Sequence, residues 1–352
     1  MQRCIELALS GLGKTSPNPM VGCVIVQEDK IIAEGYHQEY GKAHAEVNAI
    51  EKVQNKKLLK KSTLYVSLEP CSHFGKTAPC ADLISRYRIP EVVVGTLDPN
   101  PLVSGKGLEK LRQAGIKVTV PVLEKECRFL NRRFFTFHEK KRPYIILKWA
   151  QSRDGFIDGL RSDTRAGSQI KISGDKALYQ AQLWRSQEQA IIVGTNTALQ
   201  DNPRLNVRLV KGRDPLRVVI DRNLSIPSTF HLMDNSVPTL IFTEKKALPI
   251  RKNTEFIHVS SNSEAARDTE ILPFILKSLY QKNIQSLIVE GGAKLLSSFL
   301  QQNLWDETRI ITSEKELHKG IKSPEFDTAK PDSVSTLGTD SIGLYFNKNS
   351  GR

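Results

Sequence analysis

The sequence predicts an α/β protein of two consecutive domains, because apolar runs of strand length alternate with helical patterns along most of its 352 residues. The first part is expected to form an α/β/α sandwich. It ends at a basic stretch with few helix signals, residues 138–143, and a second α/β unit starts at Tyr144. We therefore predict domains at residues 1–141 and 142–352.

Short apolar runs indicate the strands, and apolar residues at helical spacing indicate the helices. Val47, Ile50 and Val53, for example, share one stripe of a helix. In the first domain we expect strands at 21–26, 31–36, 63–68, 91–96 and 116–120, and helices at about 43–54, 80–88 and 105–114. In the second we expect strands at 144–149, 189–194, 216–221, 239–243, 256–259 and 285–290, and helices at 174–187, 264–282 and 293–303. The stretch 313–352 has the weakest pattern.

Composition is that of an ordinary globular protein, with 39% hydrophobic and 25% charged residues. No apolar run reaches the length of a membrane helix, a signal peptide is not visible, and five scattered cysteines form no disulfide framework. We therefore expect a cytoplasmic protein. The formal net charge of +13 favours phosphorylated small molecules as partners. Nucleic acid and membrane are not expected partners, because no basic stripe is interleaved with aromatic residues.

One His, two Cys and one Glu form the most informative pattern, and each lies at a predicted strand–helix junction. His44, Cys71 and Cys80 are ligand types that zinc prefers, and zinc keeps a fourth position for a water whose pKa it lowers. Glu46 would then carry protons from the water to the departing amine. Singly, His44 is better explained as a helix cap and each cysteine as a small core residue. Together, the four predict hydrolytic removal of an amino group from a nitrogen heterocycle.

Two loops of the second domain suggest anion binding more weakly. Residues 290–294, Glu-Gly-Gly-Ala-Lys, lie between a predicted strand and helix, where backbone N–H groups can approach an anion. The polar loop 201–208 offers Arg208 as a phosphate ligand. An ordinary turn is the better explanation of residues 290–294 taken alone and an equally good explanation of residues 201–208. No Gly-x-Gly-x-x-Gly fingerprint supports a Rossmann domain.

Motifs along nearly the whole chain match one family. In the first domain they are residues 18–23, 35–37, 44–47, 69–80 and 98–101, and in the second residues 152–155, 194–208 and 290–296. The chain thus resembles the bifunctional riboflavin-biosynthesis enzymes of the RibD type. The eight residues between Cys71 and Cys80 are the most specific element, since nucleoside and tRNA deaminases typically have two there.

The resemblance implies a cytidine-deaminase-like first domain and a dihydrofolate-reductase-like second domain that binds NADPH. The implied reaction is zinc-dependent hydrolytic deamination of 2,5-diamino-6-(5-phosphoribosylamino)pyrimidin-4(3H)-one. NADPH-dependent reduction of the ribosyl group to a ribityl chain follows. The implied partners are the phosphorylated pyrimidine and NADPH, and we expect a homo-oligomer.

The resemblance also implies roles for individual residues. In the first domain, His44, Cys71 and Cys80 would bind zinc, Glu46 would be the proton shuttle, and Asn18, His37, His73 and Lys76 would bind the substrate. A solvated loop is the alternative for His73 and Lys76. In the second domain, Lys148, Asp201 and Glu290 would be catalytic, and Arg185, Leu205, Arg208 and Glu290 would contact the substrate. The NADPH side would comprise Ala150, Thr197, Asp201, Gly292, Ala293, Lys294, Leu295, Leu296, Ser297 and Ser298.

One departure from the family concerns a Ser-x-Trp-Ile motif of the second domain. Here Gln169 replaces the Ser and Lys171 replaces the Trp. Replacing Trp with Lys removes a flat apolar surface and adds a cation that could reach the cofactor 2′-phosphate or the substrate phosphate. We therefore assign Lys171 to cofactor binding.

Three alternatives remain open: a deaminase whose second domain is inactive, a nucleic-acid base deaminase, and a non-enzymatic zinc protein. Retention of Lys148, Asp201, Arg208 and Glu290 argues against the first, and the long cysteine insert against the second. Glu46 argues against the third, because a structural zinc site needs no proton shuttle.

Overall fold

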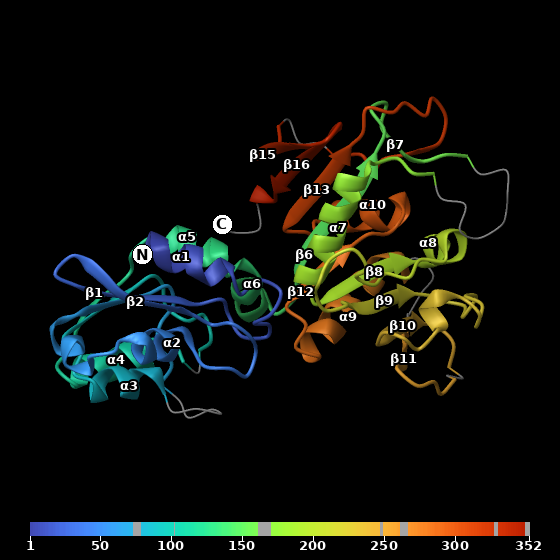
Figure 1. Cartoon of the computed structure of the whole chain (residues 1–352). Helices are drawn as coiled ribbons and strands as arrows, with labels where there is room; N and C mark the ends of the chain where they lie inside the picture. Colours follow the sequence, from blue (N-terminus) through green and yellow to red (C-terminus); the bar gives the residue numbers. More distant parts are fainter. Residues whose placement is uncertain are drawn as a thin grey trace. The chain divides into compact units, whose positions relative to one another are not determined.

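The computed structural model describes residues 1–72, 79–101, 103–160, 170–246, 249–260, 267–326 and 330–348. Backbone contacts divide the chain into two compact units, Met1–Lys141 and Arg142–Gly351. Figure 1 colours the chain from blue at the N-terminus to red at the C-terminus.

Unit 1 contains, among its described residues, a five-stranded sheet of order β2-β1-β3-β4-β5. β1 pairs antiparallel with β2 and β3, whereas β3, β4 and β5 pair in parallel. The strands are β1 (Gly22–Gln27), β2 (Lys30–Tyr36), β3 (Thr63–Val66), β4 (Glu91–Val94) and β5 (Lys117–Thr119). The helices are α1 (Gln2–Leu9), α2 (Ala45–Lys52), η1 (Lys56–Lys61), α3 (Cys80–Arg86), α4 (Lys106–Gln113), α5 (Glu124–Leu130) and α6 (Arg132–Lys140).

Helices cover both faces of this sheet (Figure 1). The apolar stripes of α2, α3 and α4 pack on one face, where Ile50, Ile84 and Leu111 are buried with strand residues. α1 and α5 lie on the other face, where Ile5 and Leu130 are buried in a smaller cluster. The predicted α/β/α arrangement is therefore what the structure shows.

Unit 2 contains a nine-stranded sheet in the part that the structure describes, with the order β11-β10-β9-β8-β12-β6-β13-β16-β15. Pairing is parallel from β11 through β13, and β16 and β15 add an antiparallel edge. β7 and β14 form a separate antiparallel pair. The right-hand side of Figure 1 shows these strands with α7 and α10 beside them.

The strands of unit 2 are β6 (Tyr144–Gln151), β7 (Phe156–Asp158), β8 (Ala190–Gly194), β9 (Leu216–Ile220), β10 (Thr239–Thr243), β11 (Thr254–His258), β12 (Ser286–Val289), β13 (Glu307–Thr312), β14 (Ile321–Lys322), β15 (Ser333–Leu337) and β16 (Asp340–Phe346). Its helices are α7 (Asp175–Gln187), α8 (Thr195–Asp201), η2 (His231–Met233), α9 (Arg267–Gln281) and α10 (Ala293–Gln301).

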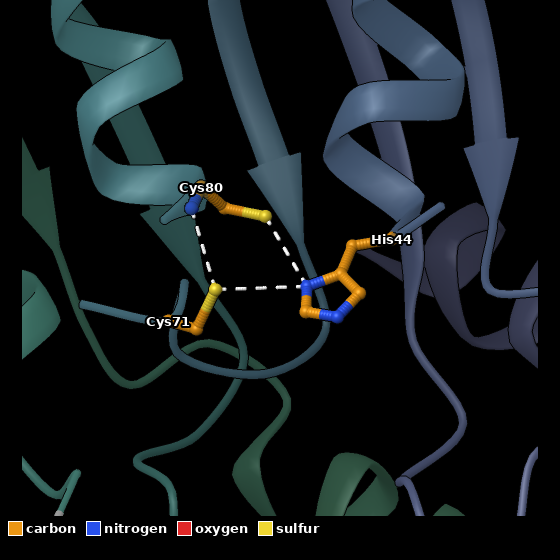
Figure 2. Close-up of side chains that lie close together, drawn as sticks. All are labelled: His44, Cys71 and Cys80. Atoms are coloured by element: carbon orange, nitrogen blue, oxygen red, sulfur yellow. Dashed lines mark hydrogen bonds between the residues drawn. The ribbon is translucent and has the colours of Figure 1, made fainter. Parts of the chain in front are cut away.

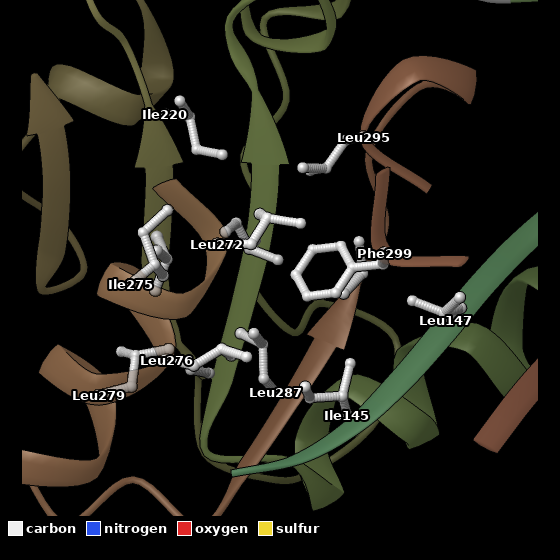
Figure 3. Close-up of a cluster of buried hydrophobic side chains, with 14 of the residues drawn as sticks. Ile145, Leu147, Ile220, Leu272, Ile275, Leu276, Leu279, Leu287, Leu295 and Phe299 are labelled. Carbon is white, nitrogen blue, oxygen red and sulfur yellow. The ribbon is translucent and has the colours of Figure 1, made fainter. Parts of the chain in front are cut away.

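Each face of the unit 2 sheet has its own apolar core. Figure 3 shows one core, in which Leu276 of α9 and Phe299 of α10 pack against Ile145, Leu147 and Leu287 of the sheet. On the opposite face, α7 and α8 bury Ala177, Trp184 and Ala198 against the same strands. The central strands are buried on both faces, which explains why they read as continuous apolar runs.

The predicted elements are present, with ends that shift by a few residues. The expected helix-poor linker at 138–143 is wrong in part, because α6 continues to Lys140 and only residues 141–143 join it to β6. β14, β15 and β16 lie in the stretch with the weakest sequence pattern. Among the described residues, none of the helices has the length and hydropathy needed to span a bilayer.

We predict that Phe299→Ala lowers the free energy of unfolding of unit 2 by about 3–5 kcal/mol, because Phe299 is 0% exposed and its removal leaves a cavity. All three Trp residues of the chain, 149, 184 and 305, lie in unit 2, so urea titration followed by Trp fluorescence reports on this unit. Val334→Ala is the control, since Val334 is 64% exposed and should change stability by less than about 0.5 kcal/mol. Equal effects of the two substitutions would contradict the assigned core.

Candidate metal site and a cavity in unit 2

Three side chains of unit 1 meet where helices begin. His44 directly precedes α2, with an extended backbone, and Cys80 is the first residue of α3, after Pro79. Cys71 follows the end of β3 in the turn that leads toward α3. The N–H groups of a helix start have no partners within the helix, so this edge of the sheet favours negatively charged ligands such as thiolates.

Figure 2 shows these three side chains pointing toward one another. His44 Nδ1 lies 3.4 Å from Cys80 Sγ and 3.6 Å from Cys71 Sγ. The Cys80 backbone N–H donates to Cys71 Sγ at 3.3 Å. The potential ligand atoms all lie within 4.8 Å of one another. One nitrogen and two sulfur donors at this spacing fit a zinc ion that keeps an open position.

The electrostatics of the cluster favour a thiolate. Hydrogen bonds with Cys80 and His44 lower the pKa of Cys71, and the positive end of α3 acts in the same direction. His44 can coordinate only as the neutral imidazole, and Nδ1 is the nitrogen that faces both sulfur atoms.

Glu46 lies in the first turn of α2, beside the cluster, and is only 3% exposed. Burial raises the pKa of Glu46 to about 7, with His44 opposing this and Cys71 adding to it. A carboxyl group of this kind exchanges protons readily near neutral pH. The geometry therefore suits a proton carrier that is not a ligand.

Asn18 and His37 form a hydrogen-bonded pair next to this cluster. His37 Nδ1 lies 3.0 Å from the Ala43 carbonyl oxygen, to which it can only donate, so His37 Nε2 accepts from Asn18 Nδ2 at 3.2 Å. The His37 ring also meets the His44 ring edge to face, with centroids 5.5 Å apart. His37 is buried, so little of its ring is open to a ligand, and its hydrogen bond orients the Asn18 side chain. His73 and Lys76 lie outside the described residues.

Unit 2 contains a cavity of about 1000 Å³ at the carboxyl ends of β6, β8, β9 and β12. Ligands of open α/β sheets bind at this edge. Predicted residues that line it are Lys148, Ala150, Lys171, Thr197, Asp201, Glu290, Gly292, Ala293, Lys294, Leu295 and Ser298. Its size and the mixed polar and apolar lining fit a dinucleotide.

A buried group of three charges lies at one end of the cavity. Glu290 accepts two hydrogen bonds from Arg185, at 2.9 and 2.7 Å, and lies 3.5 Å from Lys148 Nζ. Burial alone would raise the pKa of Glu290, but Arg185 and Lys148 outweigh it and lower the pKa to about 2. Glu290 is therefore a permanent carboxylate that holds two cations in place.

The turn after β12 forms a cradle for an anionic group. Gly292 precedes α10, and its N–H donates to Thr197 Oγ1 at 2.8 Å. A Cβ on Gly291 would lie 2.7 Å from Leu295 Cδ2, so a larger residue there would require the Leu295 side chain to move. Ala293 and Lys294, the first residues of α10, line the cavity, and a helix start at this place suits a cofactor phosphate.

Some predicted binding residues lie elsewhere. Leu205 and Leu296 are buried in the two apolar cores and are not among the residues that line the cavity. Arg185, Arg208 and Ser297 are not among the residues that line the cavity, although Arg185 lies directly behind Glu290. Lys171 lines the cavity, is 61% exposed and pairs with Asp175, the first residue of α7, at 2.5 Å. Gln169 lies outside the described residues.

Comparison with known proteins agrees with both sites. Residues 1–96 match the family model of the cytidine and deoxycytidylate deaminase zinc-binding region, and residues 143–315 match that of the RibD C-terminal domain. The riboflavin biosynthesis protein RibD of Aquifex aeolicus is 41% identical over 91% of this chain and 88% of its own. The RibD protein of Bacillus amyloliquefaciens is 40% identical, over 87% and 81%.

Solved structures show the same relationship. A diaminohydroxyphosphoribosylaminopyrimidine deaminase/5-amino-6-(5-phosphoribosylamino)uracil reductase from Thermotoga maritima is 38% identical, with a TM-score of 0.84 over 98% of this chain and 96% of that one. A RibD structure from Acinetobacter baumannii is 33% identical, with a TM-score of 0.84 over 98% and 97%.

Fold and sites together define an enzyme that joins a zinc deaminase domain to a reductase domain. The chain belongs to the RibD family of riboflavin biosynthesis. The predictions of the family, of the two domain folds and of zinc and NADPH as cofactors are confirmed.

We predict that Glu290 contributes stability to unit 2 that disappears in acid. Because its folded-state pKa is about 2, below the usual 4.5, this contribution is present above pH 4.5 and is lost as the pH falls toward 2. The difference in unfolding free energy between wild type and Glu290→Gln should therefore shrink across that range. Urea midpoints from Trp fluorescence at pH 6 and pH 3 measure it, and a constant difference would contradict the assignment.

Proposed function

We propose that this chain deaminates 2,5-diamino-6-(5-phosphoribosylamino)pyrimidin-4(3H)-one by hydrolysis and then reduces the ribosyl group of the product to a ribityl chain with NADPH. The observation that carries this proposal is the cluster of His44, Cys71 and Cys80 beside the buried Glu46. The cavity at the strand ends of unit 2 supports the second reaction. Likeness to the Thermotoga maritima enzyme supports the choice of substrate.

In the deaminase domain, His44, Cys71 and Cys80 would hold the zinc ion, which supplies a Lewis acid for activating water. Glu46 takes a proton from the water and delivers it to the departing amino group. Its burial and its pKa near 7 suit both steps. Asn18, oriented by His37, has its amide oxygen available to accept a hydrogen bond from the pyrimidine or its ribose.

In the reductase domain, bound NADPH would supply the hydride for reduction at ribose C1 once the sugar ring has opened to an imine. The cradle around Gly292 would bind a cofactor phosphate, with Thr197 and Lys294 beside it. Lys148, held by Glu290, presents a cation at the cavity wall, where it can stabilise the opened sugar. Asp201 lines the same cavity.

Arg185 and Arg208 provide positive charge near the substrate end. Both guanidinium groups contact Asn206. Burial lowers the pKa of Arg208, and the positive charges of Arg185 and Arg204 lower it further. Arg185 is already paired with Glu290, and the added charges of Arg204 and Arg208 make an anion beside this group favourable. We assign this cluster, Arg185, Arg204 and Arg208, to the substrate phosphate.

We further propose that the enzyme acts in the cytoplasm as a homo-oligomer, with small molecules rather than nucleic acid or membranes as partners. The five cysteines are all free thiols, which is typical of a reducing compartment. The net charge of +13 suits phosphorylated ligands.

We predict that Glu46→Gln abolishes deamination and leaves reduction of the supplied deaminated intermediate unchanged, because Gln cannot carry the proton. Mass spectrometry of zinc-loaded protein, with and without NADPH, separates the two products. Wild type should give the deaminated compound alone without NADPH and the ribityl compound with it. Loss of both activities in a folded Glu46→Gln protein would refute the two-site model.

We also predict that Lys171→Ala raises the KM for NADPH about two- to fivefold without changing kcat, since an exposed charge contact contributes at most about 1 kcal/mol. Lys176→Ala is the matched control, because Lys176 is exposed on the adjoining helix and does not line the cavity. An unchanged KM in Lys171→Ala would remove Lys171 from the cofactor site.

A further inference from the structure

Glu69 is a buried carboxylate two residues before Cys71, and the mechanism above does not use it. It is 4% exposed. Its Oε1 accepts hydrogen bonds from the backbone N–H groups of Gly107, at 2.9 Å, and Leu108, at 3.4 Å. Its Oε2 accepts from those of Gly105, at 2.9 Å, and Asp98, at 3.3 Å. Residues 70–71, which directly follow Glu69, are called the zinc turn below. The Glu69 side chain thus joins the chain at the zinc turn to the start of α4 and to the loop after β4.

No basic side chain forms an ion pair with Glu69 in the part of the chain that the structure describes. Its charge is met by four backbone N–H groups, three of them at the start of α4, where the helix dipole is positive. All four groups donate, so the site requires an acceptor at both oxygen positions. A glutamine of the same size would turn an N–H₂ group toward N–H donors.

The zinc turn is held from two sides. On one side, α3 donates from Cys80 N–H to Cys71 Sγ and from Ala81 N–H to the Cys71 carbonyl oxygen, at 3.1 Å. Figure 2 shows the first of these contacts. On the other side, α4 packs so closely that a Cβ on Gly107 would lie 2.0 Å from the Pro70 carbonyl oxygen. Glu69 holds α4 in that position.

We propose that Glu69 is a positioning residue for the zinc site. Glu69 fixes the zinc turn so that Cys71 Sγ lies beside His44 Nδ1 and Cys80 Sγ. This inference rests on the proposed function, because it concerns the same metal site. Groups that orient metal ligands typically change metal affinity by ten- to a hundredfold when they are replaced.

The test is Glu69→Gln in the full-length chain. We expect its zinc affinity, measured by competition with a chromogenic chelator, to fall ten- to a hundredfold. The rise in Tm on adding zinc should be smaller than in wild type, since less metal binds the folded state. Absorption of the cobalt(II)-loaded protein should change, because the Cys71 thiolate moves relative to the metal. Reduction of the supplied deaminated intermediate, a property of unit 2, should stay unchanged.

Glu109→Gln is the matched control, because Glu109 is an exposed carboxylate on the same helix, where it accepts a hydrogen bond from Gln113 at 3.2 Å. It should retain wild-type zinc affinity. If Glu69→Gln does not fold, the same zinc and cobalt measurements are made on Gly107→Ala. Its added Cβ displaces the Pro70 carbonyl group, and so the zinc turn, without changing any charge. Wild-type zinc affinity and cobalt absorption in the deciding variant would overturn the proposal. Failure of wild type itself to bind zinc would instead overturn the proposed function, and this role with it.

Discussion

The shared direction of strands in each sheet places the chemistry of both units, because it brings strand ends and the following helix starts to one edge. In unit 1, β2 and β3 point the same way on either side of β1, so His44 at α2 and Cys80 at α3 begin helices at the same edge. In unit 2, the parallel strands β9, β8, β12 and β6 end together around the cavity. Helix N–H groups then serve thiolates in one unit and a phosphate cradle in the other.

Buried charge is handled differently at the two sites. Glu290 is surrounded by Arg185 and Lys148 and stays ionised. Positive charge near Glu46 does not offset the effect of its burial, so its pKa is raised to about 7. Glu69 remains buried with backbone donors alone. Environment rather than residue type therefore sets three glutamates apart: one paired with two cations, one buried with a raised pKa, and one held by backbone donors.

Much of this arrangement could be predicted from the sequence, because local patterns determine it. Buried parallel strands read as apolar runs, and the zinc cluster reads as His44, Cys71 and Cys80 at junctions between strands and helices. The extension of α6 to Lys140 could not, since its basic last turn resembles a linker and the helix is stabilised by packing of Phe134 and Phe135. β15 and β16 could not be predicted either, because most positions of β15 are exposed and polar residues or Gly interrupt the apolar residues of β16.

Contacts between residues far apart in the sequence could not be predicted from the sequence either. Leu205 and Leu296 stand within motifs that resemble ligand-binding segments, but only the packed structure shows that their side chains belong to the cores. The role of Glu69 depends on backbone groups from 98 to 108, a segment about 30 residues away, and no periodicity signals such a contact.

The junction at residues 141–143 gives the two reactions a fixed stoichiometry. Every ribosome that completes the chain makes one deaminase and one reductase, so gene expression cannot change their ratio. The balance between the two reactions then depends on their kinetic constants and substrate concentrations, and not on separate enzyme amounts. A substitution that slows only the reductase would make the deaminated compound accumulate, however much protein the cell produces.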